Sequence, residues 1–342
     1  MINGYATNSD TSAYLDKHRV MKRDLKSFNV SPIAIGTHLG NMDELDSKLY
    51  QSSIEHALKN GINFIDTALN YRGMRSERDI GKVISHLMEN GFIKREEIVI
   101  STKAGIIPGD IDAGLVPKDY LQRILLNKGV IKKSDLHILN HQRHVLAPSY
   151  YQFAIEQSKK HLCLNTIDIH YIHNPEISLE VLGEREFYNK LESLFIFYEE
   201  QVNRGNIRYY GFATWNGFIC SPQEKGYLSL ERVLKIVSKV IGYNHHFKFI
   251  QFPYNIAIPY AKTRKNQLVH STYFTLLEAT KKLGLTAVTS APFNLGKLIS
   301  KDQKSENPLR SILNEESIGS VMVGMKQVRN VDNNLKLIKA IS

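Results

Sequence analysis

The sequence has few of the features that mark secreted, membrane or metal-bound proteins. Only two of its 342 residues are cysteines, Cys163 and Cys220, and neither lies in a CxxC pair or beside a histidine cluster with zinc-ligand spacing. We expect both to be free, half-buried thiols in a reducing compartment. No apolar run approaches the roughly 18 residues that span a bilayer, and residues 1–20 lack the apolar core of a secretory signal. These absences predict a cytoplasmic protein that binds neither metal nor membrane.

Basic residues are in excess but are not concentrated. The chain carries 44 lysines and arginines against 34 aspartates and glutamates, a formal net charge of +10, yet no run of basic residues reaches five. A nucleic-acid interface gathers such residues on one face, so we expect no nucleic-acid partner. The surplus fits either a solvated basic surface or a site for a phosphorylated ligand.

Short β-branched runs alternate with helical patterns along the chain. Eight strands are predicted, at residues 33–36, 63–66, 98–102, 167–172, 208–213, 248–252, 286–290 and 320–323. Helices are expected at 46–60, from Ser76 to Gly91, and at 186–203, 230–241 and 269–283. Eight β/α units predict a single-domain (β/α)8 TIM barrel, an α/β fold. An open doubly wound sheet is the alternative, but no GxGxxG follows any of these strands.

Three segments lie outside this regular alternation. Residues 1–18 form an N-terminal arm ahead of the barrel at 19–342, and residues 19–30 are expected to form a hairpin closing the barrel bottom. Residues 104–148 form a long insertion after strand three, which places it at the face where barrel enzymes act. A loop of this length in a compact domain is typical of a lid or a binding loop.

Polar residues gather where the predicted strands end, which in this fold is the catalytic face. They are Asp66, Tyr71, Lys103, His173, Thr214, Gln251 and Ser290. A phenol titrates near ~10, and an adjacent ammonium, held by a carboxylate, is expected to lower that pKa. Such a phenol can protonate a carbonyl oxygen while an imidazole orients it.

Six segments in series resemble the signatures of the aldo-keto reductase superfamily. They are residues 64–71 (FIDTALNY), 101–103 (STK), 167–175 (IDIHYIHNP), 205–216 (GNIRYYGFATWN), Gln251 with 253–255 (PYN), and 290–292 (SAP). The resemblance implies a nicotinamide-dependent barrel with a catalytic tetrad of Asp66, Tyr71, Lys103 and His173. His170 competes with His173, but strand alternation puts the two on different sides, and His173 stands at the strand end. His170 is expected in the barrel wall, and His141, His144, His245 and His246 in loops.

The resemblance also implies a cofactor site. Its residues are Gly36, Thr37, Asp66, Thr214, Gln251, Ser290, Pro292, Leu295, Gly296, Gly324, Lys326 and Asn334. The chain departs from the family pattern at Ala213-Thr214, where Ser-Asn is frequent, and at Asn333, where an acid is usual. Lys326 and Arg329 stand where a 2′-phosphate could be held, which favours NADPH over NADH. The alternative is two solvated charges at a helix start.

The resemblance predicts an NAD(P)H-dependent oxidoreductase that reduces a small-molecule aldehyde or ketone to an alcohol. Hydride would come from the nicotinamide and the proton from Tyr71, with Tyr71, His173 and Trp215 contacting the substrate. Two other classes stay open: a nucleotide-binding regulatory or accessory subunit with little turnover, and a metal-dependent barrel hydrolase, which lacks a paired histidine motif here. No pattern indicates an oligomeric state.

Overall fold

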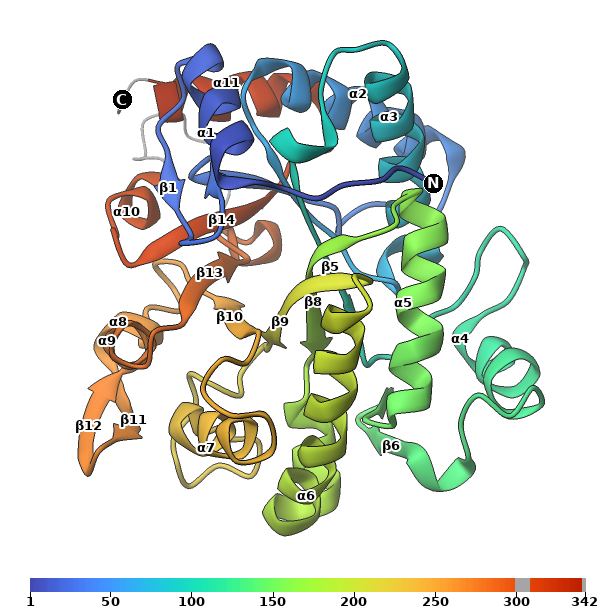
Figure 1. The fold of residues 1–342 in the computed structure, drawn as a ribbon, viewed down its shortest axis with the longest axis vertical. Coiled ribbons are helices and arrows are strands. Elements are labelled where there is room, and N and C mark those ends of the chain that lie inside the picture. The colour runs from blue at the N-terminus through green and yellow to red at the C-terminus, as the bar shows by residue number, and fades with distance from the viewer. Residues whose placement is uncertain (299–307, 340–342) are drawn as a thin grey trace.

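Eight parallel strands close into a barrel in the computed structural model, which describes residues 1–298 and 308–339 (Figure 1). They are β3 (Ile33–Gly36), β4 (Phe64–Asp66), β5 (Val99–Ala104), β8 (Ile167–His173), β9 (Ile207–Ala213), β10 (Phe247–Pro253), β13 (Thr286–Ser290) and β14 (Ile318–Gly324). The barrel closes where β14 pairs with β3. Each strand lies within two residues of its predicted position, so the predicted (β/α)8 barrel is confirmed.

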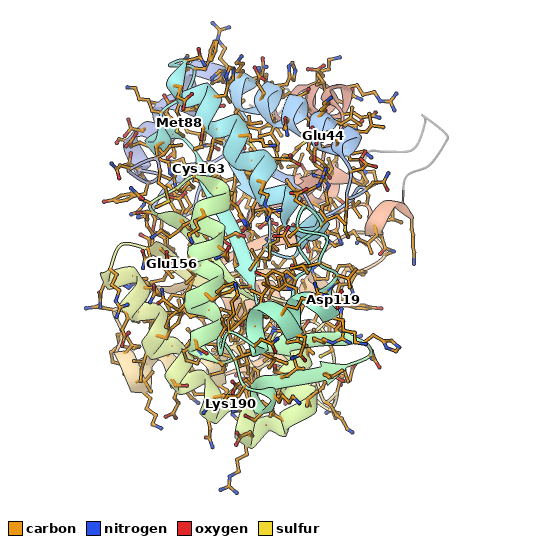
Figure 2. The ribbon with its side chains drawn as sticks, turned by 90° about the vertical axis from the view of Figure 1, so that its right-hand side faces the viewer. Glu44, Met88, Asp119, Glu156, Cys163 and Lys190 are labelled. Atoms are coloured by element: carbon orange, nitrogen blue, oxygen red, sulfur yellow. The ribbon has the colours of Figure 1, made fainter. Side chains whose placement is uncertain are left out.

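Helices cover the outside of the barrel. The longer ones are α2 (Glu44–Asn60), α3 (Arg75–Glu89), α5 (Pro148–Leu162), α6 (Glu176–Asn203), α7 (Leu230–Ile241) and α11 (Val328–Lys339), with the shorter α9 (Leu276–Lys282), α10 (Leu309–Leu313) and α8 (Tyr260–Thr263). Figure 2 shows α3, α5 and α6 packed along one side, marked by Met88, Glu156 and Lys190. Because the strands are buried on both faces, they read as continuous apolar runs.

Two local predictions were wrong. The segment 269–283 is not one helix: β11 (Lys265–Val269) and β12 (Thr272–Thr275) form a hairpin whose turn residues have positive φ, and α9 follows it. A capping box between Thr275 and Glu278 starts α9, which sequence periodicity alone did not locate. Ser76 is not an N-cap but lies inside α3, where its hydroxyl donates to the Thr37 carbonyl at 2.8 Å.

The N-terminal segments pack against the bottom of the barrel. The arm contains α1 (Asn8–His18), and the backbone N–H of Ala6 donates to Asp168 at 2.8 Å. The predicted hairpin forms from β1 (Arg23–Asp24) and β2 (Asn29–Val30). Its buried Phe28 stacks on Phe249 of β10, with ring centroids 6.0 Å apart. This hairpin therefore closes the end of the barrel opposite the carboxyl ends of the strands, as predicted.

The insertion at 104–148 has its own secondary structure. It contains α4 (Pro117–Tyr120), a π-helical segment (Leu121–Leu126) and an antiparallel hairpin of β6 (Leu136–Leu139) and β7 (Gln142–Val145) (Figure 1). Single 3-10 turns occur at Tyr71–Met74, Arg95–Glu97, Lys133–Asp135 and Asn294–Gly296. The apolar side chains of Ile107, Leu125 and Val145 are buried, so the insertion is docked on the barrel.

Among the described residues, no helix combines the length and the apolar composition that a membrane crossing requires. Both cysteines are unpaired; Cys163 is half-buried, as expected, and Cys220 is buried.

Candidate active site

A cavity of about 630 Å³ opens at the carboxyl ends of the barrel strands. Its wall comes from the loops after the strands and from the turn of the β6–β7 hairpin. It includes Asp66, Tyr71 and His173 of the predicted tetrad, together with Trp215. The same wall carries most of the predicted cofactor residues: Gly36, Thr37, Thr214, Gln251, Ser290, Pro292, Leu295, Gly296 and Gly324.

A buried ion pair lies beneath this cavity. The Nζ of Lys103, on β5, is 2.6 Å from Oδ2 of Asp66, at the end of β4, and also donates to the Thr67 carbonyl at 2.8 Å. Oδ1 of Asp66 accepts from the Ser101 hydroxyl at 2.7 Å and from the Gln251 amide at 3.0 Å. Burial opposes the charge of Lys103, but Asp66 and Tyr71 outweigh it and raise the pKa of Lys103, so its ammonium stays charged.

Tyr71 follows β4 and stands over this pair. The Lys103 Nζ lies 5.0 Å from the centroid of the Tyr71 ring, whose centroid is 5.8 Å from that of His173 and 4.6 Å from that of His38. Burial raises the pKa of the Tyr71 phenol above its usual value, and the Lys103 ammonium offsets only part of that shift. The expected lowering of this pKa was therefore wrong, because the effect of desolvation exceeds that of the ammonium. The phenol keeps its proton at neutral pH.

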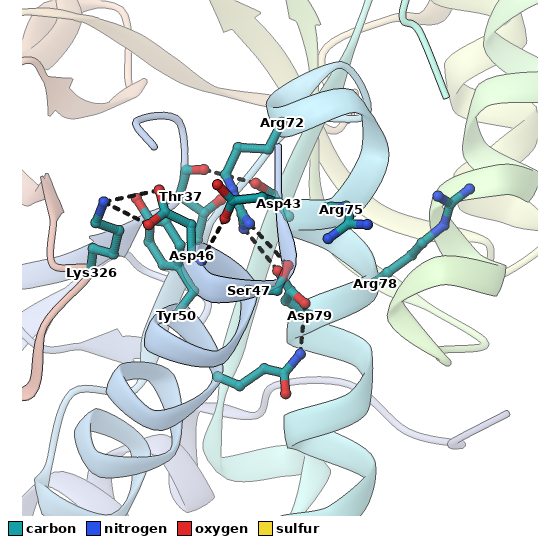
Figure 3. A network of polar contacts seen from close by, with 12 residues as sticks. Thr37, Asp43, Asp46, Ser47, Tyr50, Arg72, Arg75, Arg78, Asp79 and Lys326 are labelled. Atoms are coloured by element: carbon teal, nitrogen blue, oxygen red, sulfur yellow. Dashed lines mark hydrogen bonds and ion pairs between the residues drawn. The ribbon is translucent and has the colours of Figure 1, made fainter. Parts of the chain in front are cut away.

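A second polar network holds the loop that carries Tyr71 (Figure 3). Arg72, which follows Tyr71, is buried with φ +48°, a conformation that costs a non-glycine residue on the order of 1–2 kcal/mol. Its guanidinium donates to Asp79 at 2.8 Å, to the Ser47 hydroxyl at 3.0 Å and to the Asn41 carbonyl at 2.9 Å. These bonds tie the Tyr71 loop to α2 and α3.

His173 ends β8, as predicted, at a point where Asn174 turns left-handed with φ +51°. Burial, then the charge of Lys103, lowers the pKa of His173 well below its usual range, so the imidazole is neutral. His170 lies in the barrel wall as expected, with its Nδ1 2.8 Å from the Tyr198 hydroxyl. The four tetrad residues thus meet at one place, and His170 does not join them.

The prediction for His144 was wrong. His141, His245 and His246 lie in turns or loops, but His144 is on β7 and is fully buried. Its Nε2 lies 2.7 Å from the carbonyl oxygen of His173. The sequence did not indicate that His144 lies on a strand, because a hairpin inside an insertion is not part of the regular β/α alternation.

Two further residues on the cavity wall were missed by sequence reasoning. His38 lies two residues after β3 and reaches Tyr71. Glu176 opens α6, and its Oε1 accepts from the backbone N–H of Trp215 at 2.6 Å and of Asn216 at 3.1 Å. Their places directly after strand ends are the signal that could have found them.

The predicted nucleotide contacts divide into three groups. The hydroxyl of Thr214 is buried and has no hydrogen-bond partner within residues 1–298 and 308–339. The Gln251 amide, by contrast, is engaged with Asp66. Lys326 and Asn334 do not line the cavity: Lys326 lies 2.9 Å from both carboxylate oxygens of Asp46, and Asn334 is buried in α11.

Metal chemistry finds no support in the ligand geometry. No three histidine, cysteine, aspartate or glutamate side chains among the described residues are grouped so that they could hold an ion.

Comparison with known proteins agrees with this geometry. The sequence matches the profile of the Aldo/keto reductase family over residues 32–340. Similar solved structures include an aldo-keto reductase from Bacillus halodurans in its holo form (17% identity, TM-score 0.60, covering 93% of this chain and 90% of that one). Others are the glycerol dehydrogenase of Gluconobacter oxydans (16%, 0.58, 93% and 89%) and an aldo-keto reductase from Klebsiella pneumoniae in complex with NADPH (14%, 0.57, 93% and 90%). At these identities the structures show the shared fold, whereas the family profile spans most of the sequence. The chain belongs to the aldo/keto reductase family.

Proposed function

We propose that this protein is an NADPH-dependent reductase that converts a small-molecule aldehyde or ketone into the corresponding alcohol. The observation that carries the proposal is the meeting of Tyr71, His173 and the buried Asp66–Lys103 pair at one cavity. When bound, a reduced nicotinamide supplies the hydride that such a reaction needs. The protein then has to bind both molecules, orient the carbonyl and deliver one proton.

The four side chains can divide this work. The Tyr71 phenol, protonated at neutral pH, donates its proton to the carbonyl oxygen. The Lys103 ammonium stabilises the phenolate that remains, and Asp66 keeps the ammonium charged and in place. The neutral His173 imidazole can donate one N–H to the same oxygen and so fix its position. Trp215 and the hairpin turn line the mouth of the cavity, where substrate would be selected.

Features of the cavity wall support a nicotinamide cofactor there. Thr214 offers a buried hydroxyl without a partner among the described residues, which suits a carboxamide group. The last residue of β13, Ser290, and the loop that follows it line the same cavity and would hold the pyrophosphate, the loop through Pro292, Leu295 and Gly296. NADPH is favoured over NADH because Lys326 and the exposed Arg329 can present cations to a 2′-phosphate. The related Klebsiella structure holds NADPH, which supports this choice.

Two other parts of the proposal concern the setting of the reaction. The insertion at 104–148 would act as a lid over the substrate, because its hairpin turn lines the cavity.

Unpaired Cys163 and Cys220 fit a reducing compartment such as the cytoplasm.

Replacement of Tyr71 tests the proposal. Tyr71→Phe should reduce carbonyl turnover by a factor of roughly 10²–10⁴ and leave NADPH binding nearly intact. The matched control is Tyr243→Phe, because Tyr243 is 89% exposed and does not line the cavity. The assay is a carbonyl substrate screen followed by single-turnover oxidation of bound NADPH. Near-normal turnover in Tyr71→Phe would remove Tyr71 from the mechanism, and tight nucleotide binding without any turnover in the wild type would favour the accessory-subunit alternative.

A further inference from the structure

A chain of buried hydrogen bonds connects the insertion to the catalytic histidine. His144 of β7 is fully buried, with its Nε2 2.7 Å from the carbonyl oxygen of His173. Its Nδ1 lies 2.6 Å from the hydroxyl of Ser178, in the first turn of α6. The same hydroxyl lies 2.6 Å from Nδ1 of His137, on β6. Both strands of the hairpin therefore meet at Ser178, and one of them reaches His173.

The chemistry of these groups assigns a donor to every bond. A carbonyl oxygen only accepts, so the Nε2 of His144 must carry the hydrogen. Burial lowers the pKa of His144 to about 3, so the ring is neutral and its Nδ1 is an acceptor. The Ser178 hydroxyl donates to that nitrogen, and its oxygen accepts from the Nδ1–H of His137. The chain of bonds thus has one direction, from His137 to the His173 carbonyl.

Gly105 leaves the space in which His144 and His173 meet. Its φ is +142°, and a Cβ at this position would lie 2.5 Å from Nε2 of His144 and 2.8 Å from the His173 carbonyl oxygen. The Gly105 carbonyl also accepts from the backbone N–H of Val145 at 2.9 Å. Because Gly105 follows the strand that carries Lys103, the base of the hairpin is fixed between the strands of two tetrad residues.

We propose that His144 is a positioning residue for the reductase reaction: by binding the His173 carbonyl, it fixes the backbone from which the His173 side chain enters the cavity. This inference rests on the function proposed above. The bond reaches the carbonyl and not the imidazole, so His144 transfers no proton to the substrate. The turn of the same hairpin lines the cavity with Leu139, Asn140 and Gln142. The insertion therefore combines substrate contact at its turn with support of His173 at its base.

Two amide substitutions separate this role from a general contribution to stability. In His144→Gln the amide nitrogen lies near the ε position and can still donate to His173, whereas in His144→Asn it lies near the δ position and cannot reach it. Both introduce the same buried amide. We expect His144→Asn to lower kcat by roughly 10- to 100-fold, the cost of a small misplacement of a catalytic group. His144→Gln should stay close to the wild type, and both variants should bind NADPH as the wild type does. Equal loss of kcat in the two variants, or no loss in either, would overturn the proposal.

A measurement on the wild-type protein gives a readout that depends on neither activity nor variant folding. Long-range ¹H–¹⁵N spectra of the histidine rings should show His144 as the neutral Nε2–H form throughout pH 5–8. An Nδ1–H form, or titration of His144 near neutral pH, would overturn the proposal. If the spectra agree with this expectation while the wild-type protein reduces no carbonyl compound, the reductase function fails and the His144–His173 bond stands.

Discussion

Replacing Lys326 tests the preference for NADPH over NADH, because the structure shows the ion pair with Asp46 that Lys326 would have to share with a 2′-phosphate. Its Nζ lies 2.9 Å from both carboxylate oxygens of Asp46, with a third of the Lys326 side chain exposed. A charge-assisted hydrogen bond to a 2′-phosphate contributes about 1.5–3 kcal/mol. Sharing Lys326 with Asp46 offsets about 0–1 kcal/mol of this, as for an ion pair whose lysine reaches solvent. The net contribution is therefore about 0.5–3 kcal/mol, or roughly 2- to 150-fold in affinity.

Fluorescence titration of NADPH and NADH at one ionic strength measures this contribution. Lys326→Met should raise the Kd for NADPH by roughly 2- to 150-fold and leave the Kd for NADH nearly unchanged. Asp46→Asn should act in the opposite direction, because it releases Lys326 and removes a carboxylate that repels the phosphate. Lys336→Met is the matched control, since Lys336 is exposed on α11, the helix that begins two residues after Lys326. Equal loss of both nucleotides in Lys326→Met would show that Lys326 does not recognise the phosphate.

Three other predictions follow from the described contacts. Arg72→Met should lower the free energy of unfolding in urea by about 3–5 kcal/mol, because it leaves the buried Asp79 without its cation; a loss below about 1 kcal/mol would contradict this. Hydrogen exchange across residues 104–148 should slow further when nucleotide and substrate are both bound, and unchanged exchange in every state would make the insertion static. Burial lowers the pKa of His144 and of His170 to about 3, so only the unfolded chain takes up these protons as pH falls below 6.5. The free energy of unfolding should then fall by about 1.4 kcal/mol per pH unit for each histidine, and a pH-independent value between pH 6.5 and 4 would refute this.

The parts of the fold that sequence reasoning found are those with a strict periodic pattern. Parallel strands buried on both faces leave continuous apolar runs, and each barrel strand was located from such a run. The site followed from topology, because the ends of all eight strands meet on one face, so that Asp66, Lys103 and His173 could be placed together from strand ends alone. Tyr71 was found by its offset from Asp66 in a motif shared with the family.

The errors arose where contacts outside this pattern decide the outcome. The predicted helix at 269–283 included β12 and the turn before it, because the apolar residues there also fit helical spacing. The pKa of Tyr71 was expected to fall because the neighbouring Lys103 is evident from motifs, whereas the extent of burial is not. The Lys326–Asp46 pair joins residues 280 positions apart, and the His144–His173 bond comes from a hairpin within an insertion. No local pattern encodes such contacts.

In this site the barrel strands supply side chains, and contacts from outside the strands hold those side chains in position. The barrel determines which side chains meet, because strand ends supply Lys103 and His173. Their geometry must also be held to within a fraction of an ångström, and strand ends alone do not achieve this where the chain leaves the sheet. On one side Arg72, in a left-handed conformation, ties the Tyr71 loop to two helices. On the other, His144 holds the carbonyl of His173. Each support depends on a residue beyond the barrel strands, so loop substitutions in this chain should alter turnover without altering the fold.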